Sequence, residues 1–154
     1  MTNAAIVGIG QTPVGEHWES GLRDLAGEAI RAALEDAGLQ RVDAVYVGNA
    51  FGATISSQSQ LGALIADYAG LKGAETYTVE AAEASGGAAL RTGILAVASG
   101  MVETALVLGV EKSTDTVGTA RTKARSVSLD ADYESIHGLT PAAQAALLMR
   151  RYMH

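Results

Sequence analysis

The residue best placed to do chemistry is Glu83, which stands in the run Ala81–Gly87 (Ala-Ala-Glu-Ala-Ser-Gly-Gly). The preceding residues, Thr76–Val79, are β-branched or aromatic and predict a strand. The following segment, Ala88–Ser99, has a single charge and predicts a buried helix. A strand that bends sharply into a helix raises the residue at the bend into a pocket above the helix amides, as in a nucleophile elbow. Those amides favour the ionised carboxylate, which is suited to act as a general base, whereas a dry pocket favours the neutral form, which holds a proton.

The elements expected around this bend alternate between strand and helix. Apolar and β-branched runs predict strands at Ala4–Ile9, Val42–Val47, Thr76–Val79 and Thr104–Val110. Helical spacing and stop signals predict helices at Gly21–Ala37, with Ser20 as its N-cap, at Ser57–Ala69 and at Ala88–Ser99. This order predicts an α/β fold whose mixed, mostly parallel sheet has helices on both faces.

The character of the chain changes after Lys112. Residues 113–135 are polar, have charges of both signs and show little periodicity, which predicts a long loop. Thr140 and Pro141 then open a last helix, with Thr140 as N-cap and Pro141 in the first turn. We therefore expect a core half over residues 1–112 and a partial loop or lid region over residues 113–154.

Composition narrows the function classes. The chain has 154 residues, a net charge of −6 and no cysteine. The negative charge argues against a nucleic-acid partner, and the absence of cysteine excludes disulfides and thiolate metal sites. No metal site is predicted. No signal peptide or membrane-spanning run is recognised either, so a soluble, cytoplasmic protein without a membrane partner is expected.

The stretch Val79–Gly87 resembles the nucleophile motif of the thiolase superfamily, in particular of the acetyl-CoA acetyltransferase-like thiolases related to sterol-carrier protein. The resemblance places the family's acyl-accepting cysteine at position 83, where this chain has glutamate. It extends from Ala5–Gly8 to His137–Gln144 and covers the N-terminal half of the family only. It implies a thiolase-like βαβα half followed by the start of a loop domain.

The resemblance also implies a ligand and partners. A coenzyme A thioester would be the substrate, with no covalently bound cofactor, and the residues around it would be Ala84, Ser85, Gly86 and His137. A second polypeptide would supply the C-terminal half, two copies would associate through residues 76–81, and a small OB-fold or zinc-ribbon protein is a further partner. The composition of the central helix agrees, because a helix that is apolar nearly all round needs a covering layer on each side.

Three hypotheses for function stay open. A thiolate is needed to accept an acyl group as a thioester, whereas a carboxylate would form a far more reactive mixed anhydride. The first hypothesis is therefore a subunit that acts on acyl-CoA without acylation, by aldol-type cleavage or decarboxylation. The second is a non-acylating subunit of an acetyl-CoA acyltransferase assembly. The third is a binding or scaffold module that has the fold without the chemistry.

Each candidate residue also has an ordinary structural interpretation. Glu83 could stabilise the helix dipole by about 0.3–1 kcal/mol, and Glu80 is expected to be structural. His137 fits a surface position before a helix as well as a substrate pocket. The basic residues of the loop region fit either the phosphates of coenzyme A or a solvated loop; they are Arg121, Lys123 and Arg125.

Overall fold

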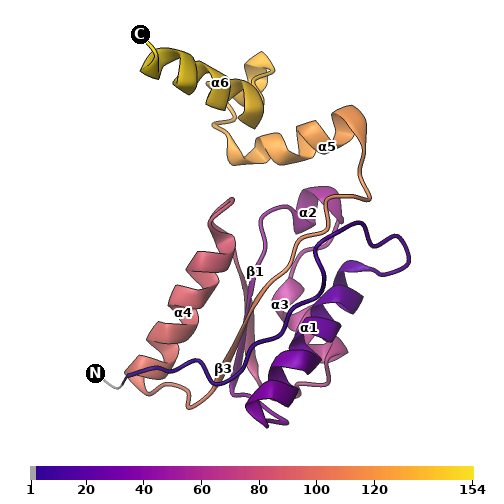
Figure 1. The fold of residues 1–154 in the computed structure, drawn as a ribbon, viewed down its shortest axis with the longest axis vertical. Helices are drawn as coiled ribbons and strands as arrows, with labels where there is room; N and C mark the ends of the chain where they lie inside the picture. The colour runs from indigo at the N-terminus through magenta and orange to yellow at the C-terminus, as the bar shows by residue number, and fades with distance from the viewer. Residues whose placement is uncertain (1–2) are drawn as a thin grey trace.

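The computed structural model describes residues 3–154 and centres on a three-stranded parallel sheet (Figure 1). The strands are β1 (Ala44–Gly48), β2 (Glu75–Val79) and β3 (Ala105–Gly109), in the order β2-β1-β3. The register pairs Ala44 with Glu75 on one side and with Ala105 on the other. Parallel neighbours need crossover helices, and the predicted α/β class is confirmed.

Helices cover both faces of this sheet. Helix α1 (Leu22–Ala37) and α3 (Leu61–Tyr68) pack on one face, and α4 (Ser85–Ser99) packs on the other (Figure 1). The alternation of side chains along a strand sorts the residues between the two layers. The α1 and α3 side receives Val45 and Val47 of β1 with Leu106 and Leu108 of β3, whereas the α4 side receives Ala44, Tyr46, Ala105 and Val107.

The predicted strand at Ala4–Ile9 is wrong for the structure, because this segment is extended but lies outside the sheet. It rests on α1 so closely that a Cβ on Gly10 would come within 2.2 Å of the carbonyl oxygen of Ala29. The amide of Ile9 donates to Asp36 Oδ2 at 2.9 Å. A strand needs a hydrogen-bonded neighbour, and between this segment and β3 there is instead an apolar cavity.

We call this cavity the edge slot. Its volume is about 580 Å³, and its two long sides are the segment Ala4–Gly10 and the strand residues Ala105–Leu108. Its floor and roof are apolar residues of α1 and α4, among them Ile30 and Ile94. Within the described residues, β3 is hydrogen-bonded to β1 alone, so its other edge faces the slot.

The remaining predicted elements exist with altered ends. Helix α1 has Gly21 rather than Ser20 as its N-cap, and α4 begins at Ser85 rather than Ala88. The predicted helix at Ser57–Ala69 is shorter, and a four-residue helix that the sequence analysis missed, α2 (Gly52–Ile55), precedes it.

Helix α4 is buried on its sheet side only. Away from that side, Leu90, Ile94 and Leu95 are exposed, with Leu95 half exposed at 50%, and Leu90 and Ile94 also line the edge slot. A helix surface of this kind is normally covered in a folded protein. Among residues 3–154 the sheet therefore covers one side of this helix and its outer face is open, as the sequence analysis expects of a chain whose second covering layer comes from elsewhere.

The region after β3 is less regular but is not a simple loop. It contains α5 (Gly118–Arg125), two short 3₁₀ turns, η1 (Ser126–Ser128) and η2 (Ser135–His137), and α6 (Pro141–Tyr152). Thr140 is confirmed as the N-cap of α6, since its Oγ1 accepts the amide of Ala143 at 3.2 Å. The domain boundary between residues 112 and 113 stays a prediction. In the described part of the chain, no helix is both long and apolar enough to cross a membrane.

Candidate active site

The bend after β2 is a tight elbow held by its own polar groups. Ala82 has a φ of 47°, in the left-handed region that residues with a Cβ rarely adopt. The Glu80 carboxylate accepts the amide of Ala82 at 2.5 Å. Ser85 Oγ accepts the amide of Ala81 at 2.9 Å and donates to the Ala82 carbonyl at 2.6 Å. The structural role expected of Glu80 is therefore found, and the strain lies one residue before Glu83.

Glu83 stands at the exposed tip of this elbow, just before the N-cap of α4, Ala84. Its carboxylate is free to meet a ligand from solvent. The described structure gives it one side-chain partner, Ser128, whose Oγ lies 3.5 Å from Glu83 Oε1. The first-turn amides of α4 face the same end of the helix, where the aligned peptide dipoles favour negative charge.

Small residues let the start of α4 approach the sheet and keep its amides open. A Cβ on Gly48 would lie 2.6 Å from the carbonyl oxygen of Ser85, so only glycine fits there. Apart from the adjoining backbone of α4 itself, no atom lies within 4 Å of a hypothetical Cβ on Gly86 or Gly87. Their N–H groups belong to the first turn, which has no intrahelical acceptor, so an anionic oxygen can approach them.

The strand ends next to the elbow are fixed by a second set of hydrogen bonds. Asn49 is buried, donates to the Val110 carbonyl at 2.7 Å and accepts the amide of Gly52 at 2.7 Å. The Glu111 carboxylate accepts the amides of Ala50 and Phe51 at 3.1 and 3.0 Å. These bonds tie the loop after β1 to the loop after β3, so both are fixed at the same end of the sheet as Glu83.

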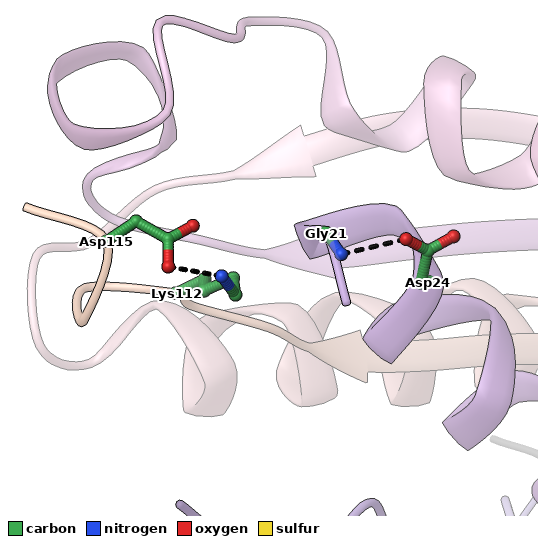
Figure 2. A network of polar contacts seen from close by, with 4 residues as sticks. All are labelled: Gly21, Asp24, Lys112 and Asp115. Carbon is green, nitrogen blue, oxygen red and sulfur yellow. Dashed lines mark hydrogen bonds and ion pairs between the residues drawn. The ribbon is translucent and has the colours of Figure 1, made fainter. Parts of the chain in front are cut away.

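Two further polar links lie near the end of β3 (Figure 2). Lys112 is buried, with 6% of its side chain exposed, and pairs with Asp115, because a buried ammonium needs a partner. The Asp24 carboxylate accepts hydrogen bonds from the amide of Gly21, at 2.8 Å, and from the hydroxyl of Tyr68. Both bonds lower the pKa of Asp24, and the bond from Tyr68 has the larger effect. The first link directs the chain from the sheet toward α5, and the second caps α1.

The structure brings some predicted site residues together and separates others. Ala84 and Gly86 lie beside Glu83 at the start of α4. Ser85 is buried and its hydroxyl is used by the elbow. His137 is exposed in η2, and no described hydrogen bond or ion pair joins it to Glu83. The roles of all these residues toward a substrate stay predictions.

Ser128 was missed by the sequence analysis. It lies 45 positions from Glu83 in a segment without periodicity, so nothing in the local sequence indicates the contact. Among residues 3–154, no group of three or more histidine, aspartate or glutamate side chains is arranged to hold a metal ion.

Comparison with known proteins agrees with this geometry. The model of a family described as the N-terminal domain of thiolase matches residues 4–150. The chain belongs to the thiolase family. The acetyl-CoA acetyltransferase of Methanothermobacter thermautotrophicus is 42% identical over 156 residues, covering all of this thiolase-family chain and 40% of the relative. The 17-hydroxy-3-oxo-4-pregnene-20-carboxyl-CoA lyase of Mycobacterium tuberculosis is 34% identical, over 98% of this chain and 40% of the relative.

A solved structure shares the fold of this thiolase-family chain. The 3-oxoacyl-(acyl carrier protein) synthase III of Pseudomonas aeruginosa superposes with a TM-score of 0.54 at 30% identity, over 66% of this chain and 32% of the synthase. The chain spans about 40% of the length of the curated relatives named above. It therefore contains the nucleophile-elbow half of the thiolase fold, as the sequence resemblance implied.

Proposed function

We propose that this chain is the elbow-bearing subunit of an enzyme that cleaves a carbon–carbon bond of an acyl-CoA without forming an acyl-enzyme. The observation behind the proposal is the intact elbow with an exposed carboxylate, Glu83, at its tip, in a chain without cysteine. A carboxylate is a competent general base. It is a poor acyl carrier, because a mixed anhydride is much more reactive than a thioester.

In the proposed retro-aldol reaction, the substrate is a 3-hydroxyacyl-CoA. Glu83 removes the proton of the 3-hydroxyl group, the C2–C3 bond breaks, and C3 leaves as the carbon of a ketone or aldehyde. The electron pair passes to C2 and forms the enolate of the shortened acyl-CoA. The open amides of Gly86 and Gly87 are suited to receive the enolate oxygen. Return of the proton to C2 completes the reaction. Decarboxylation of a 3-oxo acid would use the same enolate site.

Three relatives favour two different reactions within this fold. The relative named as a CoA lyase, 34% identical, supports bond cleavage. The acetyltransferases of Methanothermobacter and of Methanocaldococcus jannaschii, each 42% identical, support the second candidate, a non-acylating subunit of an acetyl-CoA acyltransferase assembly. Glu83 decides our preference, because a general base has a direct role in bond cleavage, whereas a non-acylating subunit of an acyltransferase gives this carboxylate no chemical step.

The proposed enzyme needs the rest of the thiolase fold. The open outer face of α4 and the edge slot beside β3 are the surfaces on which it would be built. We infer that a second polypeptide supplies this C-terminal half and that two copies of this chain meet through residues 76–81. The assembly is proposed to act in the cytoplasm, and a small OB-fold or zinc-ribbon protein is a further proposed partner.

The loop region 113–154 is proposed to cover the substrate. Arg121 and Lys123 would then lie near the phosphates of coenzyme A.

The test uses the chain assembled with its C-terminal half and a 3-hydroxyacyl-CoA, with products separated by chromatography. Glu83→Gln keeps the shape and removes the base, so it should slow cleavage by about 10²–10⁴-fold. Glu28→Gln, an exposed glutamate on α1, should have no effect. Intact mass after incubation with acetyl-CoA should show no adduct on the wild type and an acetyl adduct on Glu83→Cys.

Two outcomes would contradict the proposal. Full activity of Glu83→Gln would show that the carboxylate only stabilises the N-terminal end of α4. An acyl adduct on the wild-type peptide that contains Glu83 would instead favour an acyltransferase.

A further inference from the structure

Within the described structure, the only side-chain hydrogen bond to the Glu83 carboxylate comes from the region after β3. Ser128 ends η1 and is partly buried. Its Oγ lies 3.5 Å from Glu83 Oε1 and 3.1 Å from the carbonyl oxygen of Arg125. A serine hydroxyl has one proton to donate and two lone pairs with which to accept. Both of its acceptors here therefore compete for the same proton.

The position of Ser128 is set by contacts that do not involve Glu83. Thr54 Oγ1 of α2 donates to the carbonyl of Ala124 at 3.2 Å. The Arg125 guanidinium lies over the ring of Phe51, 5.9 Å from its centroid. Ser126 is buried, and its Oγ donates to the Thr122 carbonyl at 3.0 Å. Helix α5 is thus docked on α2 (Figure 1). The turn that follows α5 brings Ser128 to the elbow.

We propose that Ser128 is a positioning residue for Glu83, an inference that rests on the proposed function. When Glu83 is ionised, the Ser128 hydroxyl donates to it and orients the carboxylate. When Glu83 has taken the substrate proton, its O–H donates to Ser128 Oγ, and the serine proton turns to the Arg125 carbonyl. A hydroxyl can exchange these two arrangements by rotation about one bond. The base therefore has a hydrogen-bond partner both before and after the proton transfer.

This role predicts a specific kinetic pattern. Ser128 does not touch the substrate in the proposed reaction, so Ser128→Ala should lower kcat and leave KM unchanged. A hydrogen bond of ordinary strength corresponds to about a threefold to tenfold effect on the rate. Ser128→Thr keeps the hydroxyl and should restore at least half of the wild-type kcat. Val127→Ala, which removes an exposed side chain from the same turn, should be neutral.

The decisive experiment is a double-mutant cycle on the assembled enzyme with a 3-hydroxyacyl-CoA, with the thermal unfolding midpoint of each variant measured alongside. Ser128→Ala should lower kcat in the wild-type background and have no effect in the Glu83→Gln background. Equal losses in both backgrounds, or no loss in the wild type, would overturn the role of Ser128 while leaving that of Glu83. Full activity of Glu83→Gln would overturn the proposed function and this inference together.

Discussion

At the scale of single residues, the site depends on a strained alanine as much as on a charged glutamate. Ala82 holds the left-handed conformation, and its amide and carbonyl are bound by Glu80 and Ser85. The strained residue fixes the direction in which the chain leaves β2. Glu83, the next residue, is exposed at the tip of the turn as a result.

The strain at Ala82 can be measured. Ala82→Gly should raise the free energy of unfolding by about 1 kcal/mol, because glycine adopts positive φ without a Cβ clash. Ala81→Gly is the matched control, since Ala81 has no positive φ, and it should lower the same quantity by roughly 0.5–1 kcal/mol. Urea denaturation of the assembled protein measures both. A loss of stability in Ala82→Gly would show that the turn is not strained at this residue.

The residue scale also shows what sequence could and could not predict. The elbow follows from local order, because a β-branched run, a group of small residues and an apolar helix stand one after another. The positive φ at Ala82 and the contact with Ser128 do not follow from it. The positive φ depends on the hydrogen bond that the Glu80 carboxylate accepts from the Ala82 amide. The contact of Ser128 with Glu83 joins segments 45 positions apart and depends on the docking of α5 on α2.

At the scale of elements, one carboxylate joins the starts of two strands. Asp43 precedes β1, and its Oδ2 accepts the amides of Glu103 and Thr104 at 3.0 and 2.9 Å and the Thr104 hydroxyl at 3.0 Å. These hydrogen bonds lower the pKa of Asp43 below its ordinary value of 3.8, and the bond from the Thr104 amide has the largest effect. The turn before β3 is therefore fastened to β1 by an ionised group.

This lowered pKa has a definite sign for stability. The unfolded chain takes up the proton near pH 3.8, before the folded one, so the contribution of Asp43 is complete above that pH and is lost as the pH falls through the lower folded value. Thermal midpoints measured from pH 6 to pH 2.5 should therefore fall more steeply in the wild type than in Asp43→Asn. Asp67→Asn, an exposed carboxylate on α3, should follow the wild-type curve. Parallel curves for wild type and Asp43→Asn would contradict the prediction.

The elements that sequence analysis misjudged have two different physical causes. An apolar run such as Ala4–Ile9 has the composition of a strand, but a strand forms only where an edge is available within hydrogen-bond distance, and here α1 takes up the segment. Helix α2 has only four residues, too few for any periodicity to be visible. The three strands and the long helices were predicted because their patterns span enough residues to outweigh local ambiguity.

At the scale of the whole molecule, β2 is an edge strand of the described sheet. Its hydrogen bonds to β1 show which of its backbone groups point away from the sheet. The Glu75 amide donates to the Asp43 carbonyl, and the Val79 carbonyl accepts from Asn49, so alternate residues from 75 to 79 point to β1. The amides of Thr76 and Thr78 consequently point outward. These are the groups that would pair two copies through residues 76–81.

Thr76→Pro removes one outward amide and leaves the pairing with β1 intact, so it should dissociate the proposed dimer. Thr76→Val keeps the amide and should leave the dimer unchanged. The mass of the assembly in multi-angle light scattering distinguishes the two results. An undiminished mass for Thr76→Pro would place the interface elsewhere.

The open face of α4 gives a second prediction at this scale. The chain alone should bind an apolar dye such as ANS through its exposed residues Leu90, Ile94 and Leu95. The dye fluorescence should fall when the C-terminal half is added, because in the proposed assembly that half covers them. Leu95→Glu should prevent assembly, whereas glutamate at the exposed loop residue Val14 should permit it. Assembly of Leu95→Glu with normal affinity would show that the complement binds another surface.

The edge slot has a consequence for the amount of this chain that a cell can synthesise without aggregation. The strand that borders the slot, Ala105–Gly109, contains neither a charge nor a proline, and in the described structure its unpaired edge is screened by the segment Ala4–Gly10 across the slot rather than by a paired strand. Chains synthesised in excess of their complement would add strand to strand and grow into insoluble aggregates. We therefore expect that the supply of this chain must be matched to that of its complement, and that overproduction by itself gives inclusion bodies rather than a dispersed subunit.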